Sequence, residues 1–166
     1  METLTISPST RGPGYVLDAS IWVPTPRDEV FSFFSKAENL GTLTPESLGF
    51  RITTPLPIQM RKGALIDYRI SLHGIPFGWT TLIREWQPPD RFIDAQLKGP
   101  YRHWVHEHRF TDQSGGTRID DRVEYRALGG ALVHRAFVRP RLEEIFSYRA
   151  RVIRERFGGA DETPQP

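Results

Sequence analysis

The chain contains no cysteine among its 166 residues. Disulfide bonds are therefore excluded, and so are zinc sites that are built on thiolates. Any metal would have to be held by histidine and carboxylate side chains. The absence of cysteine is also compatible with a reducing compartment, and we expect a cytoplasmic protein.

Neither sign of charge dominates, and long apolar runs are missing. Lys and Arg number 22 against 20 Asp and Glu, which leaves a formal net charge of +2. Such a small excess gives no reason to expect a nucleic-acid partner. No stretch approaches the roughly 20 consecutive apolar residues that a membrane-spanning helix needs. Residues 1–14 lack the basic start and apolar core of a signal peptide, so the pattern is that of a soluble protein.

The length of the chain is typical of one domain that can form a core without disulfides. Residues 1–13 contain Ser, Thr, Pro and Gly with little periodicity, and we expect a flexible N-terminal arm there. Residues 14–158 should form the single domain. Residues 159–166 are polar and contain proline, which predicts a disordered tail.

Strand-like and helical patterns follow one another along the domain. Alternating apolar residues over 15–23 predict a strand. Thr25 and Pro26, followed by acidic residues, are typical of a helix start, and a second short helix is expected near 40–44. Segments rich in β-formers, separated by Gly and Pro, then predict an antiparallel meander. These segments are 48–54, 64–73, 77–87, 92–98, 102–111 and 117–127.

The last predicted element is a long helix with one apolar stripe. The residues that recur at three- and four-residue intervals are Leu142, Ile145, Phe146, Arg149, Ile153 and Phe157. Pro140 should kink or split this helix and leave a helical piece at 132–138. At about 1.5 Å per residue, the part from 140 to 157 would span roughly 27 Å, the width of a small curved sheet.

These elements predict an α+β fold. We expect a curved antiparallel sheet of about seven strands around the long C-terminal helix, with two short helices after the first strand. A curved sheet that wraps around one helix rarely closes completely. A cavity between the helix and the sheet is therefore expected.

The most informative segment is the predicted strand at 103–110. Its alternation puts Trp104, His106 and His108 on one face, together with Phe110. If Phe110 lies opposite Ile119 on the next strand, then the pairs across the two strands are His108 with Asp121, His106 with Val123 and Trp104 with Tyr125. Two imidazoles and a carboxylate are thus predicted inside an apolar wall.

Buried imidazoles need partners, and three interpretations stay open. His106, His108 and Tyr125 could orient the polar end of a ligand in the cavity. The His108–Asp121 pair could instead be catalytic, with His108 moving a proton while Tyr125 or His106 polarises a carbonyl. A cross-strand pair that only fixes the register is the structural alternative. A metal on His106, His108 and Asp121 is disfavoured, because no other histidine is clearly placed to join them.

Further candidates lie on neighbouring strands. A three-residue turn at 99–101 would put Phe92 and Asp94 opposite His108 and His106, and a turn of different length would turn Asp94 to the other face. We keep Asp94 as a cavity residue. Trp79 and Trp104 are expected to give the cavity flat aromatic walls that suit ring-containing or isoprenoid ligands.

Arginines are frequent in the C-terminal helical region. They are Arg135, Arg139, Arg141, Arg149, Arg151, Arg154 and Arg156. A solvated helix face explains them, and transient docking on a membrane surface for lipid pickup is the alternative. The oligomeric state is left open by the sequence.

The order of these motifs resembles the START-like helix-grip superfamily, also called SRPBCC. The resemblance rests on residues 23–31 and 38–40, Gly74-Ile75-Pro76 with Trp79, residues 85–92, Gly99-Pro100-Tyr101, the strand from Trp104 to Phe110, and Gly115-Gly116-Thr117 with Asp121 and Tyr125. It covers roughly residues 15–158. The superfamily includes polyketide cyclase/dehydrase-like proteins, coenzyme Q-binding carriers and lipid-transfer domains, and the chain most closely resembles a bacterial branch of small ligand-binding proteins within it.

The resemblance implies a cavity for a small hydrophobic ligand, and it calls for no cofactor. It does not fix a reaction, because the same fold serves carriers and cyclases. We therefore expect a carrier or sensor of a hydrophobic ligand. The alternatives are a cyclase/dehydrase-type enzyme that uses His108 and Asp121, and an interaction protein whose pocket is filled by its own side chains.

Overall fold

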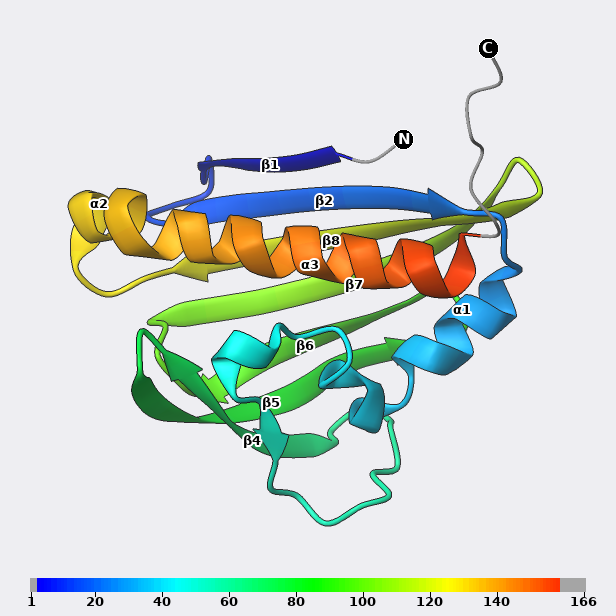
Figure 1. The fold of residues 1–166 in the computed structure, drawn as a ribbon, viewed down its shortest axis with the longest axis horizontal. Coiled ribbons are helices and arrows are strands. Elements are labelled where there is room, and N and C mark those ends of the chain that lie inside the picture. The colour runs from blue at the N-terminus through cyan, green and yellow to red at the C-terminus, as the bar shows by residue number, and fades with distance from the viewer. Residues whose placement is uncertain (1–2, 159–166) are drawn as a thin grey trace.

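The structure is a computed structural model, and it describes residues 3–158. One antiparallel sheet has eight strands in the order β1-β2-β8-β7-β6-β5-β4-β3. The strands are β1 (Thr3–Pro8), β2 (Tyr15–Val23), β3 (Arg51–Ile52), β4 (Leu65–Leu72), β5 (Ile75–Gln87), β6 (Arg91–Lys98), β7 (His103–Gln113) and β8 (Gly116–Arg126). The sheet curls strongly, and α3 (Arg139–Phe157) crosses its concave side (Figure 1).

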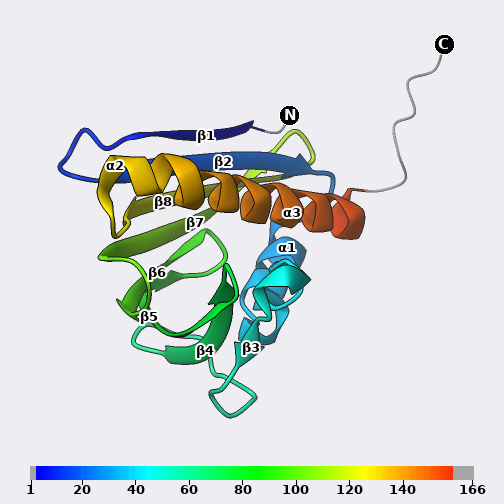
Figure 2. The same cartoon turned by 60° about the vertical axis from the view of Figure 1, so that its left-hand side comes forward.

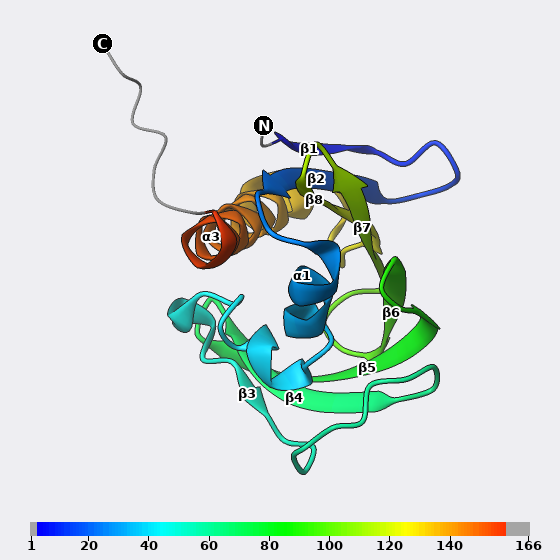
Figure 3. The ribbon, with the colours of Figure 1, turned by 90° about the vertical axis from the view of Figure 1, so that its right-hand side faces the viewer.

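Short helices cover the rest of the concave side. α1 (Arg27–Phe34) and the 3₁₀ turns η1 (Ala37–Leu40) and η2 (Glu46–Leu48) follow β2, as the two short helices of the sequence predict. Figure 3, which looks nearly along α3, shows α1 between that helix and the strands β4 and β5. The α+β helix-grip arrangement is confirmed, with eight strands where about seven were expected. No helix within residues 3–158 is both long and apolar enough to cross a bilayer.

The N-terminal segment differs from its prediction. Thr3–Pro8, expected as part of a flexible arm, form β1 and pair with β2. Leu4 and Ile6 are half-buried and pack against the core beside Leu142 and Phe146. Two apolar side chains on one face are too few to stand out as a strand pattern, but they suffice when an open sheet edge lies beside them. The predicted tail at 159–166 lies outside the described residues.

The helix before α3 is irregular, as Pro140 led us to expect. α2 (Gly130–Val133) passes into a π-helical turn, η3 (His134–Val138), and α3 then begins at Arg139. Pro140 has no N–H, and its ring would clash with the carbonyl of Ala136, so the regular hydrogen-bond pattern cannot run through this point.

The register of the central hairpin is the predicted one. Phe110 lies opposite Ile119 and His108 opposite Asp121, while Trp104 lies opposite Tyr125. The two-residue turn Ser114-Gly115 has positive φ at both positions, which is the type I′ geometry that a right-twisted hairpin needs. Gly116 is also required, because a Cβ there would lie 2.2 Å from the carbonyl oxygen of Val23.

Candidate functional site

A cavity of about 180 Å³ lies between the curled sheet, α3 and the segment from α1 to η2. Its wall is mainly apolar and includes residues from all of these elements. They include Leu43, Leu48, Phe50, Ile66, Ile70, Leu72, Trp79, Ile83, Trp104, Leu142, Ile145 and Phe146. The predicted cavity between helix and sheet is therefore present.

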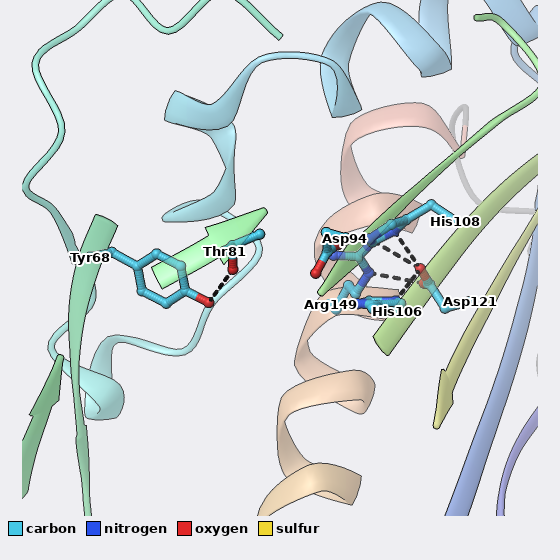
Figure 4. Close-up of polar contacts among 7 residues, drawn as sticks. All are labelled: Tyr68, Thr81, Asp94, His106, His108, Asp121 and Arg149. Carbon is cyan, nitrogen blue, oxygen red and sulfur yellow. Dashed lines mark hydrogen bonds and ion pairs between the residues drawn. The ribbon is translucent and has the colours of Figure 1, made fainter. Parts of the chain in front are cut away.

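One side of the cavity carries a cluster of five polar side chains, Asp94, His106, His108, Asp121 and Arg149 (Figure 4). Arg149 donates to both carboxylate oxygens of Asp121, at 3.0 Å from Nε and 3.1 Å from Nη2. Nε2 of His106 lies 3.0 Å from Asp121 Oδ1. His108 is held on both sides, with Nε2 2.9 Å from Asp94 Oδ2 and Nδ1 2.8 Å from Asp121 Oδ1. The five residues form one continuous network.

Burial and charge set the ionisation of the network. Burial alone would raise the pKa of Asp121, but the charge of Arg149 and the two imidazole hydrogen bonds outweigh it and hold this pKa well below its usual range. Burial alone would lower the pKa of His108, but its hydrogen bonds to Asp121 and Asp94 have the larger effect, so this pKa is raised. Asp121 is thus an anion between two cations.

The second histidine behaves oppositely. Burial lowers the pKa of His106, and the nearby charge of His108 lowers it further, which the hydrogen bond to Asp121 only partly offsets. His106 is therefore neutral. Because its Nε2–H donates to Asp121, its Nδ1 carries a lone pair and has no hydrogen-bond partner among residues 3–158.

His108 Nδ1 has two close neighbours, and whether this nitrogen carries a proton determines which of them it bonds. Arg149 Nη2 lies 3.2 Å from His108 Nδ1, and Asp121 Oδ1 lies closer, at 2.8 Å. A protonated Nδ1 donates to the carboxylate and cannot also accept from the guanidinium. The shorter contact and the raised pKa both favour the charged imidazole, with Arg149 bonded to Asp121.

The opposite wall of the cavity offers a few weaker polar groups (Figure 4). The hydroxyls of Tyr68 on β4 and Thr81 on β5 lie 3.4 Å apart. Burial raises the pKa of Tyr68 well above its usual range, so this hydroxyl keeps its proton. The indole N–H of Trp79 is buried and has no partner within the described chain. This wall is neutral, and the buried charges lie on the side of Arg149; the exposed Lys36, after α1, also borders the cavity.

Metal binding by the cluster would need a rearrangement. Asp94, His106 and His108 each offer a ligand atom, and these atoms lie within 4.8 Å of one another. Both nitrogens of His108 and Nε2 of His106 are, however, engaged with carboxylates, and the Arg149 guanidinium stands beside them; Nδ1 of His106 is the one imidazole nitrogen of the pair left open within the described chain. A divalent cation would have to displace the His108 proton in the presence of that fixed positive charge. The arrangement fits an anionic or carbonyl oxygen better than a metal.

Most predicted site residues do line the cavity. Trp79, Trp104, Asp94, His106 and His108 are all part of its wall. Asp94 pairs with His106 across β6 and β7 in the register that the three-residue turn implied. The structure thus brings together side chains from β5, β6 and β7 at one surface.

Two predicted residues lie elsewhere. Tyr125 does not line the cavity: it packs against Leu17 and Val123, and its hydroxyl is hydrogen-bonded to Nε2 of His134 at 2.8 Å. The helical segment after β8 folds over Tyr125, which a strand pattern cannot show. Asp121 lies behind the two imidazoles and meets Arg149, and it is not part of the cavity wall.

Arg149 is the site residue that sequence reasoning missed. It stands in the apolar stripe of the C-terminal helix, between Phe146 and Ile153, and it is only 6% exposed. An arginine inside an apolar helix stripe indicates a buried charge that needs an acidic partner. Without the structure, nothing showed that Asp121 would lie opposite it.

The sequence matches the family model described as polyketide cyclase/dehydrase and lipid transport over residues 23–150. The chain belongs to this family. This match agrees with the helix-grip fold that the sequence and the structure indicate. No curated protein sequence matches the chain.

Solved structures with the same fold come from bacteria and plants. The aromatase/cyclase ZhuI from Streptomyces sp. R1128 aligns over 85% of this chain and 92% of its own, with 13% identity and a TM-score of 0.67. TTHA0849 from Thermus thermophilus covers 85% and 95%, with 16% identity and a TM-score of 0.68. Major latex-like protein 151 from Panax ginseng covers 86% and 96%, with 11% identity and a TM-score of 0.63. At these identities the likeness establishes the fold alone.

Proposed function

We propose that the protein binds a small apolar ligand whose oxygen-bearing end lies against Arg149 and His106. The observation that carries this proposal is a buried guanidinium, with its polar cluster, at one side of a mainly apolar cavity. The family match supports the coarser statement, a cavity for a hydrophobic ligand or a cyclase-type substrate.

The size of the cavity limits the ligand. An engineered cavity of about 150 Å³ lined by apolar side chains binds benzene. A cavity of about 180 Å³ therefore suits a molecule of one or two rings or a short branched chain. Affinity would come from burying apolar area, at about 25 cal/mol per Å².

The polar side of the cavity would fix the orientation of the ligand. Nη1 of Arg149 makes no hydrogen bond within residues 3–158 and can donate to a carbonyl, phenol or carboxylate oxygen. The Nδ1 lone pair of His106 can accept from a hydroxyl on the same ligand. A ligand with a hydroxyl or keto group on a ring matches both.

Acid–base catalysis on such a ligand is the second candidate. Nδ1 of His106 is an unprotonated base on the cavity wall, and Nη1 of Arg149 is a donor on the same side of the cavity. Both N–H groups of His108 are taken up by Asp94 and Asp121. The base could take a proton from the carbon next to a carbonyl while the guanidinium stabilises the enolate oxygen that forms. The aromatase/cyclase among the similar structures gives this alternative its weight. Tyr125, which the sequence offered for polarising a carbonyl, has no place in it.

Native mass spectrometry of freshly purified protein tests the proposal most simply. We expect a retained small molecule that is released into organic solvent. Thr81→Phe should abolish retention, because Thr81 is buried on the cavity wall and a phenyl ring there would occupy the space.

Thr80→Phe is the matched control. Thr80 is the neighbouring residue of β5, and its side chain points to the other face, toward Asp67. This variant should retain the molecule as wild type does. Equal retention by both variants would show that the ligand lies outside the cavity. Turnover of the extracted ligand that is lost in His106→Gln would favour the catalytic alternative.

A further inference from the structure

The end of the molecule that carries α2 brings four chain segments together (Figure 2). The ring of His73, in the β4–β5 turn, contacts the ring of Phe137 in η3, with centroids 5.7 Å apart. Tyr15, after the β1–β2 turn, stacks on His134 at 3.4 Å. His103, after the β6–β7 turn, pairs with Arg126 at the end of β8. These contacts join the segments into one face.

The four segments of this face contain no acidic residue, while Glu124 of β8, next to the last of them, pairs with Arg11 of the β1–β2 turn. Residues 6–17, 70–82, 95–106 and 125–142 contain no Asp or Glu. Arg102, Arg126 and Arg135 are exposed there, and none of them forms an ion pair in the part of the chain that the structure describes. By contrast, the exposed Arg139 at the start of α3 is neutralised by Glu143. The positive charges of Arg102, Arg126 and Arg135 are thus left without compensation within the described residues.

Large apolar side chains stand out from the same surface. Leu132 is 72% exposed, and Ile75, Phe137 and Leu128 are each more than half exposed. The backbone at Gly129 has φ 86°, which carries the chain away from the sheet and directs α2 outward. Half-buried Val138 and buried His134 fix the inner side of the helical segment, so Leu132 and Phe137 are held outward. A folded protein rarely exposes several large apolar side chains together on one surface unless that surface binds a partner.

We propose that this face docks on the surface of an anionic lipid bilayer. Leu132 and Phe137, with Ile75 and Leu128, would enter the interface between head groups and chains, while the unpaired arginines would lie among lipid phosphates and carboxylates. Nucleic acid fits less well, because the protruding groups are mostly aliphatic and offer bases little to stack on.

The docking face also touches the cavity. Leu72 of the cavity wall is paired with Ile75 of the face in the β4–β5 hairpin. Tyr101, next to Arg102, lines the cavity as well. A protein docked in this way holds one edge of its cavity close to the lipid. Docking does not depend on the proposed ligand, however. Loss of vesicle binding would contradict docking alone, and absence of a retained molecule would contradict the ligand proposal alone.

Sedimentation with vesicles tests the docking. Wild-type protein should co-sediment with vesicles of phosphatidylcholine and phosphatidylserine in equal amounts, and not with phosphatidylcholine alone. Leu132→Glu/Phe137→Glu should abolish binding. Arg126→Glu/Arg135→Glu should weaken it at least about 25-fold, since each arginine near such a surface contributes about fivefold. Binding should also fall with added salt.

Matched controls change exposed residues of the same kinds elsewhere. Leu65→Glu on β4 and Arg61→Glu in the loop before it alter hydrophobicity and net charge by similar steps away from the face. The double variant of these two should bind as wild type does. Absence of wild-type binding to the anionic vesicles would overturn the proposal, and so would equal losses in the control. Binding to a single-stranded oligonucleotide but not to vesicles would overturn it in favour of nucleic acid.

Discussion

Arg149 is the residue on which the polar cluster depends most. It is buried in α3 and donates to both oxygens of Asp121, whose carboxylate also accepts from His106 and His108. Removing one partner of a buried ion pair leaves the other charge uncompensated, which costs more than the pair itself contributes. The contribution of Arg149 to stability can therefore be measured by unfolding, without a ligand present.

Arg149→Met should lower the free energy of unfolding by about 3–5 kcal/mol, because Asp121 then stays buried without its guanidinium. Urea denaturation measures the change. Arg149→Met/Asp121→Leu should recover much of it, since both charges are then gone. Arg151→Met, at an exposed position of the same helix, is the control and should stay near wild type. A loss in Arg149→Met no larger than in this control would show that Asp121 does not rely on Arg149.

The opposite pKa shifts of the two histidines give opposite pH dependences. Folding raises the pKa of His108, so its charged form stabilises the fold fully below the unfolded pKa of about 6.5, and this contribution is lost as the pH rises through the raised folded pKa. Folding lowers the pKa of His106, so the folded state favours its neutral form. The stability that the neutral imidazole contributes is lost as the pH falls below the unfolded pKa of about 6.5.

Urea denaturation over a series of pH values tests both signs. The difference in unfolding free energy between wild type and His108→Gln should shrink as the pH rises above neutrality. The difference between wild type and His106→Gln should shrink as the pH falls below it. Parallel trends for the two variants would contradict the assignment of one charged and one neutral imidazole.

Among the elements, β1 gives the clearest prediction. It covers the edge of β2, and Leu4 and Ile6 pack on the core near Phe146. Deleting residues 1–8 should lower the unfolding free energy by about 1–3 kcal/mol, the amount expected for two half-buried apolar side chains. The newly exposed β2 edge should also promote self-association. Unchanged stability together with a monomeric deletion variant would show that β1 is dispensable.

The sequence predicts the central hairpin well and the sheet edges poorly. The register of β7 and β8 follows from a two-residue turn and a strict alternation of apolar residues, two local signals that agree. β3 was expected over 48–54, but only Arg51–Ile52 pair in the structure, because η2 takes up Glu46–Leu48. Edge strands pair on one side only, so their sequences carry weaker patterns.

At the scale of the whole molecule, the cavity was predictable and its chemistry only in part. One helix over a strongly curved sheet leaves space, and that follows from the number and length of the elements. His106 and His108 could be placed on the cavity wall by alternation along a single strand. The contact of Arg149 with Asp121, and the position of Tyr125 outside the cavity, depend on how α3 and η3 pack across the sheet. No local sequence pattern contains that information.

A comparison of two fluorescent probes, 2-naphthol and naphthalene, tests the central claim most directly. Titration of the tryptophan fluorescence suits it, since Trp79 and Trp104 line the cavity. Both probes should bind, and 2-naphthol should bind at least about tenfold more tightly, because a hydrogen bond to a charged group is worth about 1.5–3 kcal/mol. Equal affinity for the two probes, or binding of neither, would contradict an apolar cavity with a polar side at Arg149.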